Sequence, residues 1–293
     1  ILYIIKAMKL IFILILTYTF VSSNNISANE NIENCSIKNV PSKERIFSKN
    51  FSGVFNEKRI DYIASLKEKI IYEKDNPSEP MASFFYTEYI VESDKNRPII
   101  FSFNGGPGSA SLWLHMGVLG PKVIKVPSDA SDDGAAPFKI VDNKLSPLSD
   151  ADLVFIDPIG TGYSRAIGCH EPEEFWGVSE DPKIIAEFIR RWINDNKRWN
   201  SPRFILGESY GGIRGPLLVS ELRSGSITPI EVNGLLLVAP ASDYQYLVFH
   251  PGNNSPHYGF LPSYAATAYY HGKIETKKTL QEFYEDSKKF SLE

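Results

Sequence analysis

The sequence lacks an excess of charge of either sign. Its 293 residues contain 31 Lys and Arg against 35 Asp and Glu, a formal net charge of −4. The two signs are interspersed, with no basic stripe and no acidic tail, so the charge pattern predicts no nucleic-acid partner. Apolar residues make up 43% of the chain and aromatic residues 13%. This composition is sufficient for a large core, as one big α/β domain or two smaller ones.

A long hydrophobic run is also lacking. The apolar run at 10–20 is shorter than the roughly 20 residues that a membrane-spanning helix needs. It follows Lys6 and Lys9 and precedes small and polar residues, which is the layout of a signal peptide over 1–28, with Met8 as the initiator. We therefore expect export to a secreted, periplasmic or other lumenal compartment, with no stable membrane span after cleavage. An uncleaved anchor or a buried helix is the alternative.

Cysteine is scarce, with only Cys35 and Cys169 in the chain. In an exported protein these two are candidates for one disulfide, because oxidising compartments preserve such bonds. Each could equally be a small buried residue or pair with a cysteine outside this chain.

The usual nucleotide-binding motifs are absent. A glycine-rich loop, Asn-Gly-Gly-Pro-Gly-Ser-Ala-Ser at 104–111, follows the apolar run 97–103 that is typical of a buried strand. The loop has neither a Gly-Lys-Ser/Thr ending nor the G-x-G-x-x-G spacing, so it does not predict a phosphate cradle. We expect no cofactor and no metal ion.

The chain divides by composition into four parts. After the signal, residues 29–52 are rich in Asn, Glu, Lys and Ser and predict a flexible leader. Residues 53–241 alternate strand-like and helix-like patterns, and residues 242–293 are aromatic and proline-containing, like the start of an inserted cap. Strands are expected at 59–64, 84–91, 97–103, 151–156, 203–206 and 232–239, and helices from 182 onward and over 213–222. This alternation argues for a parallel sheet with crossover helices.

The segment Gly-Glu-Ser-Tyr-Gly-Gly at 207–212 carries the strongest chemical signal. It contains a G-x-S-x-G core between a strand pattern and a helix pattern, the order of a nucleophile elbow. Such a turn brings the backbone close to itself, which requires glycine beside the serine, here Ser209. An ordinary tight strand-to-helix turn with a serine is the structural alternative.

Three blocks together resemble the serine carboxypeptidases. They are the loop at 104–111, Asp-Pro-Ile-Gly-Thr-Gly-Tyr-Ser at 157–164 and the elbow at 207–212, in the order of that family. The resemblance implies an α/β-hydrolase fold, with a mostly parallel central sheet, flanking helices and a cap insertion. Ala110 stands where many eukaryotic members carry a disulfide-forming cysteine, so the loop looks more like that of bacterial members.

The resemblance also implies roles for individual residues. Ser209 would be the acylating nucleophile, and the N–H groups of Gly106 and Tyr210 would stabilise the oxyanion. A second group, consisting of Asn104, Gly105 and Glu208, would hold the free C-terminal carboxylate of a peptide or protein substrate. Two carboxylates in contact cannot both stay ionised, so acidic conditions should favour that binding.

The acid and base of a triad are missing from the expected places. Hydrolases of this fold place Asp and then His after strands that follow the nucleophile. Downstream of Ser209 the histidines are His250, His257 and His271, and none follows a buried strand pattern. The chain therefore reads as an N-terminal portion, truncated at its C-terminus and inactive as it stands. An esterase or acyltransferase using the same serine, or a non-catalytic secreted fragment or pseudoenzyme, stays an alternative. No motif indicates which side chain is preferred in the released residue, or the oligomeric state.

Overall fold

The computed structural model describes residues 40–92, 96–127, 131–132 and 134–293. The expected signal peptide at 1–28, residues 29–39 of the expected leader and Cys35 lie outside these residues. Cys169 takes part in a disulfide bond, but its pairing with Cys35 stays a prediction. Across the described ranges we find no helix with the length and apolar character needed to cross a membrane.

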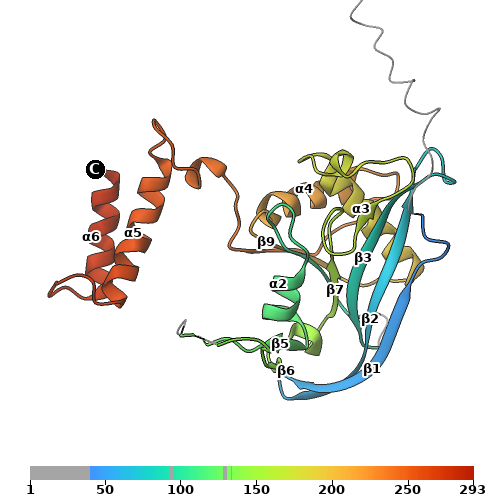
Figure 1. Cartoon of the computed structure of the whole chain (residues 1–293), viewed down its shortest axis with the longest axis horizontal. Coiled ribbons are helices and arrows are strands. Elements are labelled where there is room, and N and C mark those ends of the chain that lie inside the picture. The colour runs from blue at the N-terminus through green and yellow to red at the C-terminus, as the bar shows by residue number, and fades with distance from the viewer. Residues whose placement is uncertain (1–39, 93–95, 128–130, 133) are drawn as a thin grey trace, which may run out of the picture.

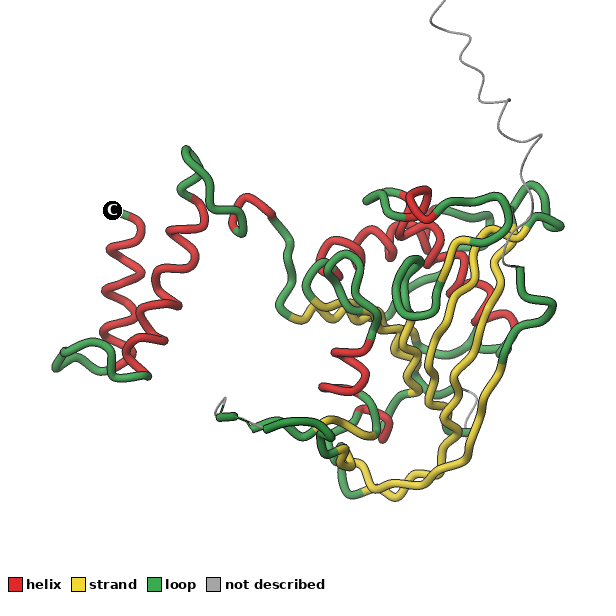
Figure 2. Tube along the Cα trace, viewed as in Figure 1, coloured by secondary structure: helices red, strands yellow, loops and turns green. Residues whose placement is uncertain are grey.

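One mixed sheet forms the centre of the molecule (Figures 1 and 2). Its strand order is β1-β2-β3-β7-β4-β9-β10, and β8 pairs with β3. The strands are β1 (Ile46–Phe55), β2 (Lys58–Tyr72), β3 (Pro80–Ile90), β4 (Ile99–Phe103), β7 (Asp152–Ile156), β8 (Arg165–Ala166), β9 (Arg203–Glu208) and β10 (Gly234–Val238). A separate hairpin pairs β5 (Lys122–Ile124) with β6 (Ile140–Asp142).

The sheet is parallel only in the half that carries Ser209. β7, β4, β9 and β10 run parallel, whereas β1, β2, β3 and β7 pair antiparallel. The expected mostly parallel sheet is therefore a mixed one. The parallel half follows the predicted strand–helix alternation. In the antiparallel half, β1, β2 and β3 follow one another in the chain and need no crossover helix.

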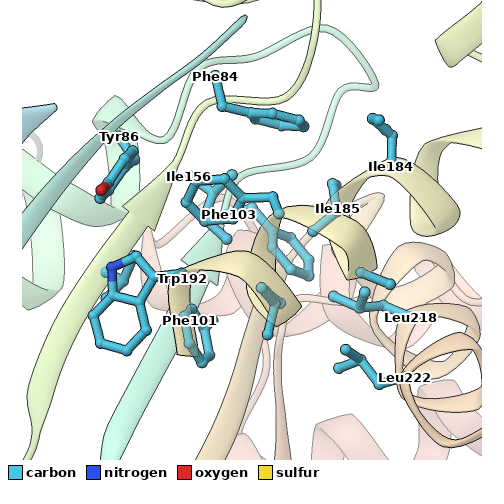
Figure 3. Packing of buried hydrophobic residues seen from close by; sticks show 14 of the residues in the cluster. Phe84, Tyr86, Phe101, Phe103, Ile156, Ile184, Ile185, Trp192, Leu218 and Leu222 are labelled. Atoms are coloured by element: carbon cyan, nitrogen blue, oxygen red, sulfur yellow. The ribbon is translucent and has the colours of Figure 1, made fainter. Parts of the chain in front are cut away.

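Two long helices cover one face of this sheet (Figure 1). The helices are α3 (Glu180–Asp195) and α4 (Gly211–Ser224). Phe101 and Phe103 of β4 point to this face together with Ile156 of β7, and they pack against Ile185 and Trp192 of α3 (Figure 3). Helical spacing aligns the apolar residues of α3 on one side of the helix. These residues, Ile185, Phe188, Ile189, Trp192 and Ile193, are all buried.

The opposite face is closed by short elements. These are α2 (Leu112–Leu114), the π-helix η1 (His115–Leu119) and the 3-10 helix η2 (Pro147–Ser149). Leu114 and Leu148 from these elements pack against Leu153, Phe155 and Leu206 of the sheet. Alternate strand residues thus reach the two cores, as the two-residue period of a strand requires.

The expected leader ends earlier than predicted, because residues 46–52 belong to β1. Most of this strand is exposed, so its sequence shows no apolar alternation. It is held instead by continuous antiparallel pairing with β2, from Ile46 with Lys67 to Phe55 with Lys58. The connecting residues Asn56 and Glu57 have φ of 45° and 67°, the positive values at both central positions that suit a twisted two-residue hairpin.

The last part of the chain lies to the side of the core. β10 is the final strand in the sheet order, and its residues 235–238 are 37–42% exposed. A linker with the 3-10 helix η4 (Tyr244–Tyr246) leads to an antiparallel pair of helices, α5 (Ser255–Tyr270) and α6 (Leu280–Leu292), which stands apart from the sheet in Figure 1. This helical pair occupies the segment expected to begin a cap, and its role as a cap stays a prediction. The remaining short element, η3 (Pro172–Phe175), precedes α3.

Candidate functional site

The turn between β9 and α4 has the geometry of a nucleophile elbow. Ser209 has φ of 58°, a left-handed conformation that is strained for a residue with a side chain. A Cβ on Gly207 would lie 2.6 Å from the carbonyl oxygen of Gly211, so only glycine fits there. Main-chain hydrogen bonds of 3.0 Å from Ser209 N to Val238 O and of 2.8 Å from Ala241 N to Ser209 O fix the turn to β10 and the residues after it.

The glycine-rich loop after β4 lies directly against this elbow. A Cβ on Gly105 would be 2.4 Å from the Tyr210 nitrogen and 2.8 Å from the Ser209 Cβ. Gly106 has φ of 109°, a conformation that L side chains rarely adopt. The structure therefore brings together two segments about a hundred positions apart. Both lie at the carboxyl ends of adjacent parallel strands, β4 and β9, which is where open α/β sheets bind ligands.

The C-terminal part of the same loop is anchored on the neighbouring strand β7. The Ser111 N–H donates to Asp157 Oδ1 at 2.8 Å, and the Ser111 hydroxyl donates a short hydrogen bond to the Ile156 carbonyl. Burial raises the pKa of Asp157, while the Ser111 hydrogen bond opposes that rise. The block at 157–164 thus has a structural role beside the loop that sequence reasoning did not assign to it.

Glu208, Asn104 and Gly105 form one hydrogen-bonded group. Glu208 Oε2 accepts from Asn104 Nδ2 at 3.0 Å and from the Gly105 N–H at 3.3 Å. Asn104 is fully buried, whereas Glu208 is partly exposed. The three residues assigned by resemblance to carboxylate binding are therefore neighbours. Glu208 directly precedes the nucleophile in the chain.

A buried ion pair contacts the backbone of Asn104 in this hydrogen-bonded group. The sequence analysis did not predict it. Arg214 on α4 is 2% exposed; its Nε donates to Asp181 Oδ2 at 2.6 Å and its Nη1 to the Asn104 carbonyl at 2.7 Å. Its guanidinium lies 5.2 Å from the Phe103 ring centre and 5.1 Å from that of Tyr210. Burial raises the pKa of Asp181, and the charge of Arg214 opposes this shift.

The position of Arg214 on α4 is the sequence feature that could have predicted this buried ion pair. Leu217 is one of the apolar residues at helical spacing from which this helix was predicted, but it is 40% exposed. Arg214, Leu218 and Leu222, each four residues apart, form the buried face instead. An arginine in register with buried leucines indicates a buried charge that needs a partner.

None of the five histidines of the chain is hydrogen-bonded to Ser209 among the described residues. His115 is partly buried beside Tyr89, with 2.6 Å between His115 Nε2 and the tyrosine hydroxyl, and His170 contacts glutamates. The three downstream histidines lie in the linker before α5, in α5 and at its C-terminal end. That none of them acts as the catalytic base stays a prediction.

The described residues contain no group of three or more His, Cys, Asp or Glu side chains placed to hold a metal ion. The site therefore consists of a strained serine, the main-chain N–H groups of a glycine-rich loop and of the elbow, and one carboxyl group held by an amide. Such a set can attack a carbonyl, stabilise the resulting oxyanion and bind a neighbouring polar group.

Comparison with known proteins gives consistent results. A sequence model described as serine carboxypeptidase matches residues 65–288. Serine carboxypeptidase-like 9 of Arabidopsis thaliana is 30% identical over 177 residues, which cover 57% of this chain and 38% of that relative. Serine carboxypeptidase-like 5 of the same plant is 30% identical over 185 residues, 58% of this chain and 40% of the relative. The chain thus spans about two fifths of the length of these curated relatives.

Among solved structures, the chain is similar to the prohormone-processing carboxypeptidase Kex1 of Saccharomyces cerevisiae. The match has a TM-score of 0.49 and 19% sequence identity, and covers 77% of this chain and 47% of that one.

Proposed function

Because the chain belongs to the serine carboxypeptidase family, we propose that the full-length protein releases C-terminal residues from peptides through an acyl-enzyme on Ser209. The observation that carries this proposal is the hydrogen-bonded group of Asn104, Gly105 and Glu208 directly beside Ser209. A nucleophile next to a site for a free carboxylate selects the last peptide bond of a chain, since only that bond has a carboxylate at the required distance.

In the proposed mechanism the Ser209 hydroxyl attacks the scissile carbonyl. The N–H groups of Gly106 and Tyr210 donate to the oxygen that becomes negatively charged. Removal of one such donor typically costs about 100-fold or more in rate. The C-terminal carboxylate of the substrate accepts from Asn104 and Gly105 and shares a proton with Glu208, because two adjacent carboxylates cannot both remain ionised.

A general base must accept the Ser209 proton and return it to the leaving amine. Since none of the described histidines contacts Ser209, we assign this base to residues of the full-length protein outside the described set. The described residues supply the nucleophile, the oxyanion donors and the carboxylate clamp.

We also propose that the protein is exported. The signal-peptide layout of 1–28 supports this, and so does the participation of Cys169 in a disulfide bond, because such bonds persist in oxidising compartments. Its substrates would be peptides or proteins with a free C-terminus.

The proposal is tested on the full-length protein with an organophosphonate probe and three substrates. We expect labelling at Ser209, hydrolysis of a blocked dipeptide acid in preference to its amide and to a simple ester, and loss of both labelling and hydrolysis in Ser209→Ala. Preferential hydrolysis of the simple ester would favour an esterase. Transfer of the acyl group to an added alcohol in place of water would favour an acyltransferase. Labelling that persists in Ser209→Ala would overturn the assignment of the nucleophile.

A further inference from the structure

Arg214 contacts the backbone of the carboxylate clamp and has no role in the mechanism above. It is 2% exposed, and its Nη1 donates a 2.7 Å hydrogen bond to the Asn104 carbonyl. This carbonyl and the Gly105 N–H belong to one peptide group, and the Gly105 N–H donates to Glu208 Oε2 at 3.3 Å. Arg214 and Glu208 are thus hydrogen-bonded to the two polar ends of the same peptide.

The geometry of this peptide links its two hydrogen bonds. The bond between Asn104 and Gly105 is trans, and in a planar trans peptide the carbonyl and the N–H point in opposite directions. A donor that holds the carbonyl on one side therefore directs the N–H to the other side. On that side the N–H meets Glu208, where the proposed function places the substrate carboxylate.

The local sequence does not fix the orientation of this peptide. Gly105 has to be glycine, because a Cβ there would lie 2.4 Å from the Tyr210 nitrogen. Glycine has wide conformational freedom, so the peptide before Gly105 is free to rotate unless something holds it. A rotated peptide would turn its carbonyl oxygen toward Glu208 and would repel a carboxylate ligand. The Arg214 hydrogen bond opposes that rotation, and its charge polarises the peptide, which strengthens the N–H as a donor.

Arg214 is itself held in one position. Its Nε donates to Asp181 Oδ2 at 2.6 Å, and its Cζ lies 5.2 Å from the ring centre of Phe103 and 5.1 Å from that of Tyr210. Arg214 belongs to the first turn of α4, which begins directly after the elbow that carries Ser209. The nucleophile and the residue that holds the clamp peptide are therefore carried by the same helix start, which fixes the position of Ser209 relative to the clamp.

From these observations we propose that Arg214 is a positioning residue of the carboxylate clamp. It holds the peptide between Asn104 and Gly105 so that the Gly105 N–H donates to the C-terminal carboxylate of the substrate. The inference rests on the proposed function, since that function places a carboxylate at the clamp. The Asn104 side chain has a separate anchor in the Leu114 N–H, at 3.0 Å. Loss of Arg214 should therefore weaken one of the two clamp donors and leave the other in place.

Binding without turnover gives the first test. In the full-length protein with Ser209→Ala, calorimetry measures Kd for a blocked dipeptide acid and for the corresponding amide. Adding Arg214→Met should raise Kd for the acid about tenfold, as expected for a weakened hydrogen bond to a charged group. Kd for the amide should stay within about twofold of its original value, since the amide has no charge for the Gly105 N–H to bind. An unchanged Kd for the acid, or an equal rise for acid and amide, overturns the inference.

Two matched variants separate positioning from a general loss of stability. Asp181→Asn breaks the ion pair but keeps the Arg214 hydrogen bond to the carbonyl, so it should not weaken binding of the acid. Arg198 is a second buried arginine with the same kinds of partner, since it donates to Asp152 and to the Arg97 carbonyl, each at 2.7 Å. These contacts lie at the amino ends of β7 and β4, away from the site, so Arg198→Met should also leave binding of the acid unchanged.

A rise in Kd for the acid in either control as large as that in Arg214→Met would indicate a merely structural role and overturn the inference. Arg214→Met leaves Asp181 buried without its partner. If that variant does not fold, the double variant with Asp181→Asn, which has no unpaired buried charge, takes its place and should show the same rise in Kd for the acid.

Kinetics separate this inference from the proposed function. For the blocked dipeptide acid, Arg214→Met should raise KM about tenfold and leave kcat unchanged, because the clamp binds the substrate equally in the ground state and the transition state. A lower kcat with an unchanged KM overturns the inference and leaves the proposed function standing. Failure of the unmutated full-length protein to hydrolyse the acid overturns the proposed function, and calorimetry then decides separately whether Arg214 supports carboxylate binding.

Discussion

The Asn104 side-chain amide donates a 3.0 Å hydrogen bond to Glu208, although the two residues are 104 positions apart in the chain. The orientation of that amide is set on its other side, where Asn104 Oδ1 accepts from the Leu114 N–H at 3.0 Å. Glu208 Oε1 has no hydrogen bond within the described residues, so one oxygen of the carboxyl group remains available to a ligand. Asn104 and Glu208 are therefore already positioned, before any ligand binds, as part of a site for a carboxylate.

This relationship predicts a pH dependence of substrate binding. In the full-length protein, KM for a blocked dipeptide acid should rise with pH, because loss of the proton shared by Glu208 and the substrate carboxylate leaves two like charges in contact. KM for the dipeptide amide should not rise. Glu208→Gln keeps a donor that does not titrate, so it should flatten the profile for the acid. Superimposable KM profiles for acid and amide in the unmutated protein would remove Glu208 from the binding site.

The close approach of Gly105 to the elbow predicts a strong effect of one added methyl group. In Gly105→Ala the new Cβ would lie 2.4 Å from the Tyr210 nitrogen and 2.6 Å from the Glu208 carbonyl oxygen, so the backbone that carries an oxyanion donor must move. We expect the rate of organophosphonate labelling of Ser209 to fall by about 100-fold or more. Gly117→Ala is the matched control, since a Cβ there meets nothing within 4 Å. Equal labelling rates in the two variants would contradict the proposed donor geometry.

The ion pair of Arg214 and Asp181 predicts strong thermodynamic coupling. Arg214→Met leaves a buried carboxylate without its partner, and such single losses typically destabilise a protein by about 3–5 kcal/mol. Combining it with Asp181→Asn removes the uncompensated charge, so the double variant should be more stable than the sum of the single effects predicts. Urea unfolding of the four proteins gives the coupling free energy in a double-mutant cycle. Simple additivity would show that the two residues do not stabilise each other.

The burial of His115 predicts a loss of stability in acid. Burial lowers the pKa of His115 to about 4, whereas an unfolded histidine has a pKa of about 6.5. Between about pH 4 and pH 6.5 the unfolded chain binds more protons than the folded one. The free energy of unfolding therefore keeps its full value above about pH 6.5 and falls as the pH drops toward about 4. The loss amounts to about 3 kcal/mol, from about 1.4 kcal/mol per pKa unit.

Urea unfolding at pH 7 and pH 4 measures this loss. His115→Phe should lose less stability between the two pH values than the unmutated protein does, although it leaves the Tyr89 hydroxyl without its partner and is less stable at both. His257→Phe, at an exposed position of α5, should keep the original pH dependence. An unchanged pH dependence in His115→Phe would show that other groups cause the acid sensitivity.

The features that could be predicted from the sequence depend on near neighbours. The elbow was predictable because the strain at Ser209 and the close contact between Gly207 and Gly211 involve residues within a few positions of one another. The parallel strands and α3 were predictable because apolar residues repeat with the period of each element. The family resemblance then identified Asn104 and Glu208 as partners, which no local pattern could have done.

Other features were decided only by the tertiary structure. Strand β1 has little apolar pattern of its own and exists through its pairing with β2. Arg214, within a helix predicted from its leucines, became buried because Asp181 from another helix and the Asn104 carbonyl surround it. The cavity lined by Pro107, Ile159, Trp176 and Arg214 is formed by segments that meet only once the order of β7, β4 and β9 is set. Local conformation and periodicity act over a few residues and can be recognised in sequence, whereas these contacts depend on the strand order of the sheet, which brings distant segments within hydrogen-bonding distance.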